Sequence, residues 1–290
     1  MSVTRSLGII EPADVRRLTW EDKAAALVEG TRTLHSLMHG TVCPVVMGQI
    51  DKSAIERAIV LTYERITLLL DGIAALKDPA HFQIANSVAR TVFELVLDLK
   101  AFRSDPSLAA KFFAFTDVVK FRKAEQLVTF LDGNTTIDRS PHQHAITFAS
   151  DAQRKRQVEQ QCIQHWGANK SQQPNWPDHW SGKSTAERAR HAGLEFEEMY
   201  RSQYFLQSQY VHSGLAGIQN LSRNALICSF AIAHALIQRL AATATELIGD
   251  QFHLFNTNLE LRDRLLAASS ASRFYALETV LRQRVEVLES

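Results

Sequence analysis

Apolar residues recur at intervals of three and four along most of this chain, which is the spacing of one face of an α-helix. The clearest case is "DKSAIERAIVLTYERITLLLDGIAALKD", which begins at Asp51 and repeats apolar residues at positions 55, 59, 66, 69 and 73. The same spacing predicts helices over 19–40, 79–103, 107–131, 142–167, 184–193, 194–213, 222–249 and 258–288. We therefore predict an all-α protein, a multi-helix bundle with one long loop that contains tryptophan and proline.

Capping residues mark the ends of several of these helices. Thr19 is an N-cap candidate, since Asp22 follows three residues later, and Gly40 is expected to stop the same helix. Pro79 is expected to open a helix and Gly167 to close one. The chain has only 12 glycines and 7 prolines, which favours helices over strands and tight turns.

Length and charge limit the class of protein. The 290 residues are enough for one large helical core, so we predict a single domain over 1–290, with the best internal boundary at the break over 131–142. Lys and Arg total 32 and Asp and Glu total 31, which gives no broad electrostatic footprint for nucleic acid or an anionic membrane. The expected partner is a small anion or another protein, an oligomer is compatible with the sequence, and no membrane partner is expected.

The cysteines and the longest apolar run point to a cytoplasmic protein. Cys43, Cys162 and Cys228 are isolated from one another, so they form neither a disulfide framework nor a zinc site, and free thiols in a reducing cytoplasm are expected. The first residues contain no apolar run typical of a signal peptide. The run "ALICSFAIAHALI" over 225–237 is predicted to be a buried helix.

The letters "GKST" in "DHWSGKSTAERARHAG" resemble a nucleotide-binding loop. Such a loop needs a glycine five residues before the glycine of GKS and follows a buried strand. Here Pro177 stands at that position before Gly182, and "SQQPNWPDHW" is not a strand. Ser184 followed by Glu187 instead predicts a capping box at the start of a helix, with Gly182 supplying a turn.

A charged stripe lies on an otherwise apolar helix. In "SVARTVFELVLDLKAF" apolar residues surround the helix almost completely, which predicts a central position. Arg90, Glu94 and Asp98 follow one another at intervals of four and therefore share one face. This stripe is either an intrahelical ion pair on a narrow solvent-facing strip or one wall of a functional pocket, because buried charges need partners.

A second stripe combines aromatic and polar side chains in "EMYRSQYFLQSQYVHSG". Its members, again at intervals of four, are Tyr200, Tyr204, Ser208 and His212. Core aromatics with one satisfied histidine at a helix end would explain this stripe by itself. Considered with the first stripe, it predicts a shared pocket that contains Arg90, Glu94 and His212, with the Trp180–Ser184 segment at its mouth.

Three motifs, "ARTVFE", "HWSGKS" and "SQYVHSG", occur in this order. In their order and separation the chain resembles a bacterial family of all-helical proteins that is described only as a domain of unknown function. The resemblance covers roughly 85–214 and implies a helical core. The residues that match the family pattern are Arg90, Glu94, Trp180, Ser181, Lys183, Ser208, Tyr210 and His212.

Two functions are compatible with these features. The first is a binding or regulatory module whose polar pocket takes a small anion, a peptide or a helical protein, with Arg90 and Lys183 as anion partners. The alternative is a metal-independent endoribonuclease of toxin or anti-phage type, in which His212 acts as general acid and base. Such proteins carry Arg and His four to six residues apart, a pattern that occurs here about as often as chance gives.

Other enzyme classes find little support in the sequence, and we expect no metal and no other cofactor. A metal site could use His142 and His144 or Glu94 and Asp98, but no HExxH or paired ExxH pattern is present. A serine hydrolase that uses Ser208 or Ser181 would need a nucleophile elbow in an α/β pattern, and neither is present.

We expect no specific binding of ATP or GTP at the GKST segment, because proline replaces the glycine that would curl around phosphate. Isothermal titration calorimetry with magnesium and either nucleotide should show no saturable heat. Micromolar, magnesium-dependent binding that Lys183→Ala abolishes would contradict this prediction.

Overall fold

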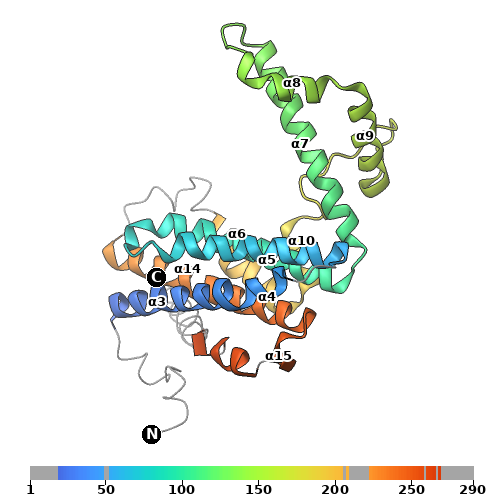
Figure 1. The fold of residues 1–290 in the computed structure, drawn as a ribbon. Helices are drawn as coiled ribbons and strands as arrows, with labels where there is room; N and C mark the ends of the chain where they lie inside the picture. The colour runs from blue at the N-terminus through green and yellow to red at the C-terminus, as the bar shows by residue number, and fades with distance from the viewer. Residues whose placement is uncertain are drawn as a thin grey trace. The chain divides into compact units, whose positions relative to one another are not determined.

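The structure of this protein, a computed structural model, describes residues 19–48, 52–204, 207–208, 222–257, 259–265 and 267–268. These residues form eleven α-helices and no strand, so the all-α prediction is confirmed. Figure 1 shows several helices joined by short connections, and a long irregular segment over 167–184, which contains Trp176, Trp180, Pro174 and Pro177, joins α9 to α10. Two compact units can be distinguished by internal packing, a first unit of Met1–Arg103 with Arg188–Ser290 and a second unit of Ser104–Glu187. The predicted break over 131–142 lies within the second unit, and a single domain over 1–290 stays a prediction.

The first unit is built from long helices that the hydrophobic pattern largely predicts. Its α-helices are α3 (Trp20–Leu37), α4 (Cys43–Met47), α5 (Ala54–Ala74), α6 (Phe82–Ser104), α10 (Thr185–Ala192), α11 (Leu194–Met199), α14 (Arg223–Gln251) and α15 (Leu254–Thr257). Two π-helical turns, Met38–Val42 and Tyr200–Tyr204, and a 3₁₀ turn, Pro79–His81, connect some of them. Helices α6 and α10 cross the limits of this unit, which fall after Arg103 and before Arg188.

Helix α14 lies at the centre of the first unit, beside α3 and α5 (Figure 1). Its buried residues lie on every side of the helix, and the apolar run over 225–237 is part of it, so the predicted buried helix is confirmed. By length and composition, α14 is the one helix among the described residues that could cross a membrane. About two thirds of its most apolar window, 67%, is buried inside the structure, as is usual for a core helix, so this property is weak evidence for a membrane span.

Buried polar side chains join α3 to α14. Thr31 Oγ1 lies 2.9 Å from His234 Nδ1, and Gln238 Nε2 donates to the main-chain oxygen of Leu27 at 2.5 Å and to Thr31 Oγ1 at 3.2 Å. A Cβ atom at Gly30 would come within 3.0 Å of the Gln238 amide, so glycine leaves the space that this side chain occupies. These contacts fix which residues of the two helices face each other, since a buried polar group without a partner is costly.

Helix ends agree with the sequence at the capping boxes, and one of the predicted glycine stops differs. Thr19 and Asp22 form the expected capping box, and α5 has the same arrangement at Ser53 with Glu56. The predicted stop at Gly40 is wrong. The chain stays helical through Met38–Val42 and continues as α4, because Gly40 does not take the left-handed conformation that ends a helix. Asp51 lies outside the described residues.

The second unit contains α7 (Leu108–Asp132), a 3₁₀ turn (Ser140–His142), α8 (Gln143–Ser150) and α9 (Ala152–Trp166). One helix was predicted over 142–167, but Asp151 interrupts it. The Asp151 backbone is extended, and its carboxylate accepts from the main-chain nitrogens of Gln153 and Arg154, which starts α9 as a separate helix. Gly167, with φ of 82°, closes α9 as predicted.

The core of the second unit is small and aromatic. Val118 and Phe121 of α7 and Val158 of α9 are buried together. Half-buried aromatic side chains pack against them, namely Phe148, Trp166 and Trp176. Much of α7 is therefore covered on one side only, and Phe130 in its last turns is 55% exposed.

Burial of His234 predicts a pH-dependent stability. Desolvation lowers the pKa of this histidine from its ordinary value of 6.5 to about 4. The unfolded chain therefore takes up a proton between these values while the folded chain stays neutral, so folded stability falls as the pH drops from 6.5 toward 4. The loss that this group causes should be roughly 3 kcal/mol.

His234→Gln removes the titrating group and should lose this part of the decline. Urea unfolding of both proteins at a series of pH values from about 4 to 7 measures the difference, because carboxylates contribute equally to each. If both proteins lose stability in parallel, His234 does not stay neutral in the folded state.

Candidate functional site

The charged stripe of α6 lies on a helix whose other faces are buried. Apolar neighbours on both sides of the stripe are almost completely covered, with Ala89 and Phe93 on one side and Leu95 and Leu99 on the other. Helix α6 begins after Pro79–His81, as the sequence predicts, and the spacing of four places Arg90, Glu94 and Asp98 along one line. The stripe therefore meets other elements of the first unit, and its charges have to be balanced there.

At one end of the stripe, Asp98 forms a buried ion pair with Arg188 of α10. Arg188 Nη1 donates to Asp98 Oδ1 at 2.7 Å and to the main-chain oxygen of Glu94 at 3.3 Å. The two side chains are only 4% and 8% exposed. A charge so completely removed from water needs a partner of opposite sign with good hydrogen-bond geometry, and this pair provides both.

Arg188 was not predicted from the sequence. A signal for such a residue exists, because the stripe has two carboxylates and one arginine, and a second cation is needed to balance them. The periodicity of α6 does not indicate which helix supplies this cation. Ala189, which follows Arg188, is buried, and such a small neighbour lets an arginine-bearing helix lie close to its partner.

At the other end of the stripe, Arg90, Glu94 and Tyr204 contact one another. Arg90 Nε donates to the Tyr204 hydroxyl at 3.0 Å and lies 3.4 Å from Glu94 Oε1. The same hydroxyl donates to Glu94 Oε1 at 2.5 Å. The Arg90 and Glu94 side chains are 23% and 31% exposed, so both are accessible from solvent, unlike the Arg188–Asp98 pair.

Aromatic packing holds the Tyr204 ring in this position. The ring stacks on Tyr200 with centroids 5.1 Å apart and lies 5.5 Å from the ring of Phe93. The Arg90 guanidinium is 5.1 Å from the centre of the Tyr204 ring, within range of a cation–π contact. Tyr200 and Tyr204 belong to a π-helical turn, a feature that occurs often at functional sites because it shifts the register of side chains.

The electrostatics of this contact favour a charged Arg90. Burial by itself would lower the pKa of Arg90, but the hydrogen bond to Tyr204 and the nearby carboxylate of Glu94 raise it above its ordinary value. With Arg188 of α10 included, two arginines balance the two carboxylates of the stripe. The Arg188–Asp98 pair is almost closed to solvent, whereas the Arg90–Glu94 pair is partly exposed.

The remaining predicted residues are distributed over both units. Ser208 is half-buried in the first unit. Trp180, Ser181 and Lys183 lie in the second unit, and their predicted place at the mouth of a pocket with Arg90 stays a prediction. Tyr210 and His212 lie outside the described residues, and a pocket shared by Arg90, Glu94 and His212 stays a prediction.

The segment with the GKST letters is organised as a turn and a helix start. Ser184 Oγ accepts from the main-chain nitrogen of Glu187 and Glu187 bonds back to Ser184, so the predicted capping box is confirmed. Gly182, with φ of 69°, lies against Trp166, and a Cβ atom there would come within 2.9 Å of the indole. Trp166 Nε1 also donates to the main-chain oxygen of Trp180 at 2.9 Å.

Neighbouring side chains stabilise the same turn. His179 Nδ1 lies 2.8 Å from Ser181 Oγ, which accepts from the main-chain nitrogen of Lys183 at 3.1 Å. The Lys183 side chain is exposed. In the described part of the chain, no three His, Cys, Asp or Glu side chains converge in a geometry that could hold a metal ion.

The fold and the stripe define an all-helical protein in which a buried ion pair lies beside an accessible one. The model of a family of unknown function, DUF5677, matches residues 56–225, more than half of the chain, and the chain belongs to this family. The match extends from α5 to the start of α14 and so contains the whole stripe with its partners. Comparisons with curated proteins and with solved structures gave no match.

Membership confirms the predicted resemblance to a family of unknown function, whereas the three motifs and a bacterial origin stay predictions. The matched range is wider than the predicted 85–214, because it also includes most of α5. The family description assigns no activity, so the function has to be argued from the site.

Removal of one partner of the buried ion pair should destabilise the first unit strongly. Asp98→Ala leaves Arg188 charged and buried without its carboxylate, and the free energy of unfolding should fall by about 3–5 kcal/mol. The double variant Asp98→Leu with Arg188→Met should recover much of this loss, since no buried charge remains.

Glu195→Ala is the matched control, because it breaks the more exposed Arg239–Glu195 pair, with N and O 2.6 Å apart. That change should cost less than about 1 kcal/mol. Urea unfolding followed by circular dichroism gives both values. Equal losses in Asp98→Ala and Glu195→Ala would refute the structural role of the buried pair.

Proposed function

We propose that this protein is a binding module whose ligand is recognised by the accessible contact of Arg90, Glu94 and Tyr204. One observation carries the proposal, namely that a charged pair on a core helix remains 23% and 31% exposed beside a pair that is closed to solvent. A purely structural ion pair at the centre of a helical core gains nothing from this access. The motif "ARTVFE", which contains Arg90 and Glu94, would then mark the helix that carries the site.

The chemistry of the contact limits the ligand. Arg90 can pair with a carboxylate or phosphate oxygen in place of Glu94, because guanidinium groups bind such anions strongly. Glu94, released from Arg90, still accepts from the Tyr204 hydroxyl and lies 3.9 Å from Arg188, and its partly exposed carboxylate can take a further donor from the ligand. The ligand in this proposal is therefore small and carries an anionic group together with a donor such as an ammonium or amide group.

The buried ion pair of Arg188 and Asp98 also helps to position this site. Arg188 donates to the main-chain oxygen of Glu94, so the pair holds the backbone that carries the accessible carboxylate. Tyr204 is fixed by Tyr200 and Phe93, and its hydroxyl bridges Arg90 and Glu94. Because these polar groups are positioned before the ligand binds, less conformational entropy is lost on binding.

The composition supports a cytoplasmic location within the same proposal, since the charge is balanced and the three cysteines are free. The alternative, a metal-independent endoribonuclease, depends on His212, which lies outside the described residues. Arg90 would then stabilise charge on a phosphate, and His212 would move the protons.

Two near-isosteric variants test the binding proposal. Arg90→Lys keeps the charge but loses the planar fork, and Glu94→Gln keeps the shape but loses the charge. Each should weaken binding of small zwitterionic ligands by about tenfold or more, while the melting temperature changes little. A thermal-shift screen of amino acids and dipeptides, followed by calorimetry of the ligands found, measures this.

Acetate and methylammonium, which carry only one of the two groups, serve as ligand controls and should bind far more weakly. If ligands bind the wild type, Arg90→Lys and Glu94→Gln equally well, the site lies elsewhere. Cleavage of RNA without added metal, abolished by His212→Ala in a protein that still folds, would favour the alternative.

A further inference from the structure

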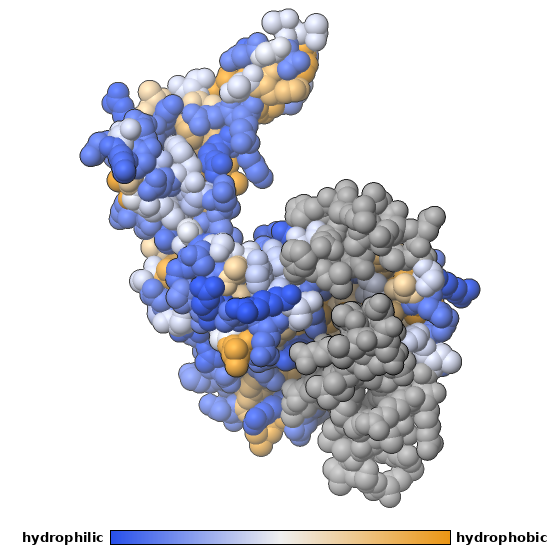
Figure 2. Space-filling view, turned by 180° about the vertical axis from the view of Figure 1, so that it is seen from behind, coloured by the Kyte–Doolittle hydropathy of each residue, from blue (hydrophilic) through white to orange (hydrophobic). Residues whose placement is uncertain are grey.

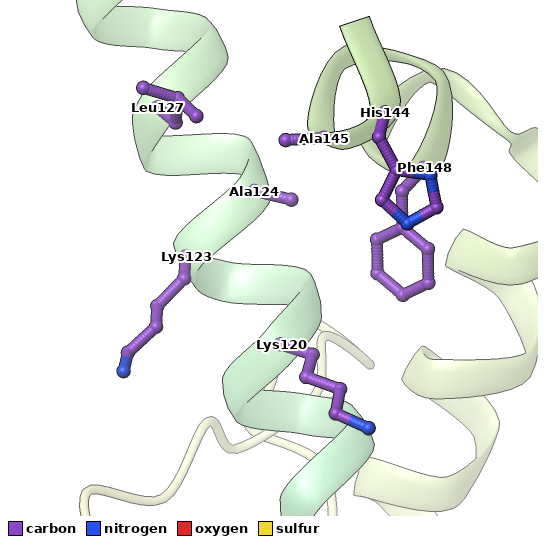
Figure 3. Close-up of a pocket in the computed structure, with 7 residues that line it drawn as sticks. All are labelled: Lys120, Lys123, Ala124, Leu127, His144, Ala145 and Phe148. Carbon is purple, nitrogen blue, oxygen red and sulfur yellow. The ribbon is translucent and has the colours of Figure 1, made fainter. Parts of the chain in front are cut away.

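The second unit contains a groove between α7 and α8 that is separate from the stripe of α6. Figure 3 shows the side chains that line it. They are Lys120, Lys123, Ala124, Leu127, His144, Ala145 and Phe148, and the groove has a volume of about 330 Å³. This size lies at the lower end of the range for sites that bind small molecules. All residues over 104–187 are described, so the walls of the groove are complete within this unit.

The spacing of residues in α7 and α8 explains the shape of the groove. Its α7 residues stand at positions 120, 123, 124 and 127, which is one face of a helix. Ala124 and Ala145 point toward each other in Figure 3, and their small side chains leave the space between the helices open. Phe148 forms the inner wall and packs against the core residue Phe121, with ring centroids 6.3 Å apart.

The lining is apolar inside and cationic at its edges. Lys120 and Lys123 are exposed, and neither forms an ion pair with a described residue. The guanidinium of Arg154 in α9 lies 5.5 Å from the centre of the Phe148 ring and adds a third positive charge. No acidic residue lines the groove. Glu125 of α7 pairs with Lys155, with N and O 3.4 Å apart.

The apolar surface continues beyond the groove. Phe130 follows Leu127 by one turn of α7 and is 55% exposed. Figure 2 shows hydrophobic residues gathered at the end of the second unit where α7 turns toward α8. The apolar part of a ligand has room to extend from the cationic edge of the groove past Leu127 toward this end of the unit.

We propose that the groove binds an amphipathic anion, that is, a phosphate or carboxylate joined to an aliphatic chain. The chain lies between Ala124, Leu127 and Phe148, where it removes apolar surface from water. The anionic group lies at Lys120, whose side chain extends on the groove side of α7 in Figure 3, while Lys123 points away and adds positive charge nearby. No acidic lining residue neutralises these charges. Inorganic phosphate lacks the chain and a neutral alcohol lacks the charge, so each uses only half of the groove.

This site is independent of the contact of Arg90, Glu94 and Tyr204. It uses residues of the second unit alone, and the two proposals can fail separately. The same chemistry is offered by a free single-chain amphiphile and by an anionic lipid in a membrane, and both sources can be tested with defined compounds.

Calorimetry of the full chain with decyl phosphate, kept below its micelle concentration, tests the groove directly. Decyl phosphate should bind, and decanol and inorganic phosphate should bind at least about tenfold more weakly. The double variant Lys120→Gln with Lys123→Gln should lose about tenfold in affinity for decyl phosphate, and added salt should reduce wild-type binding. Leu127→Gln should weaken binding of the chain while leaving both lysines in place.

The matched control is Arg156→Gln with Lys170→Gln, which removes two exposed charges of the same unit outside the groove and should leave binding unchanged. Circular dichroism confirms that each variant is folded. Vesicles of phosphatidylglycerol, compared with phosphatidylcholine, identify the source. Lysine-dependent binding to them assigns the ligand to a lipid, and binding of decyl phosphate alone assigns it to a free amphiphile.

Three results would overturn the proposal. These are equal binding of decanol and decyl phosphate, equal affinity in the lysine variant and its matched control, and no binding of decyl phosphate by a folded wild-type chain. Binding of an acidic amphipathic helix peptide without any binding of decyl phosphate would reassign the groove to a protein partner.

Discussion

The ion pair between Arg188 and Asp98 is the interaction on which the arrangement of the candidate site depends. It joins α10 to α6 through two side chains that are 4% and 8% exposed. Because neither charge can be left alone in such surroundings, α10 has one favourable position on α6. The chain that follows α10 then brings α11 and the π-helical turn to the same side, where Tyr204 meets Arg90 and Glu94.

The polar stripe of α6 therefore combines two tasks along a single helix face. Asp98 is covered and fixes the packing, whereas Glu94 and Arg90 are reachable from solvent. The main-chain oxygen of Glu94 accepts from Arg188 while its carboxylate accepts from Tyr204. A ligand that displaces Glu94 from Arg90 would act on a side chain, and the backbone below would stay in place.

Much of the fold could be predicted from the sequence because local signals decide it. Capping boxes at Thr19 and Ser184 identify helix starts, and the apolar run of α14 identifies the core helix. Some local signals have more than one outcome. Gly40 was expected to stop a helix, yet it keeps a helical conformation and the helix continues, and the Asp151 side chain starts a new helix inside the predicted one.

For the site, periodicity put Arg90 and Glu94 on one face and Tyr204 on another helix, and the two stripes were paired only by the argument that buried charges need polar partners. Which helices meet is a tertiary property, and a single sequence contains no direct record of it. The stripe has one more carboxylate than arginine, so a cation from another helix could be expected. The sequence does not indicate that this cation is Arg188. His212, which the sequence placed beside Arg90, lies outside the described residues.

Gly30 and Gln238 show how closely two helices can be fitted to each other. The amide of Gln238 lies 3.0 Å from the point where a Cβ atom at position 30 would stand, so a larger residue there requires the Gln238 side chain to shift. Such a shift would disturb the hydrogen bonds that Gln238 donates to the main-chain oxygen of Leu27 and to Thr31. A methyl group added to α3 would therefore act on the polar contacts of α14, and the effect of the substitution would be felt on the neighbouring helix.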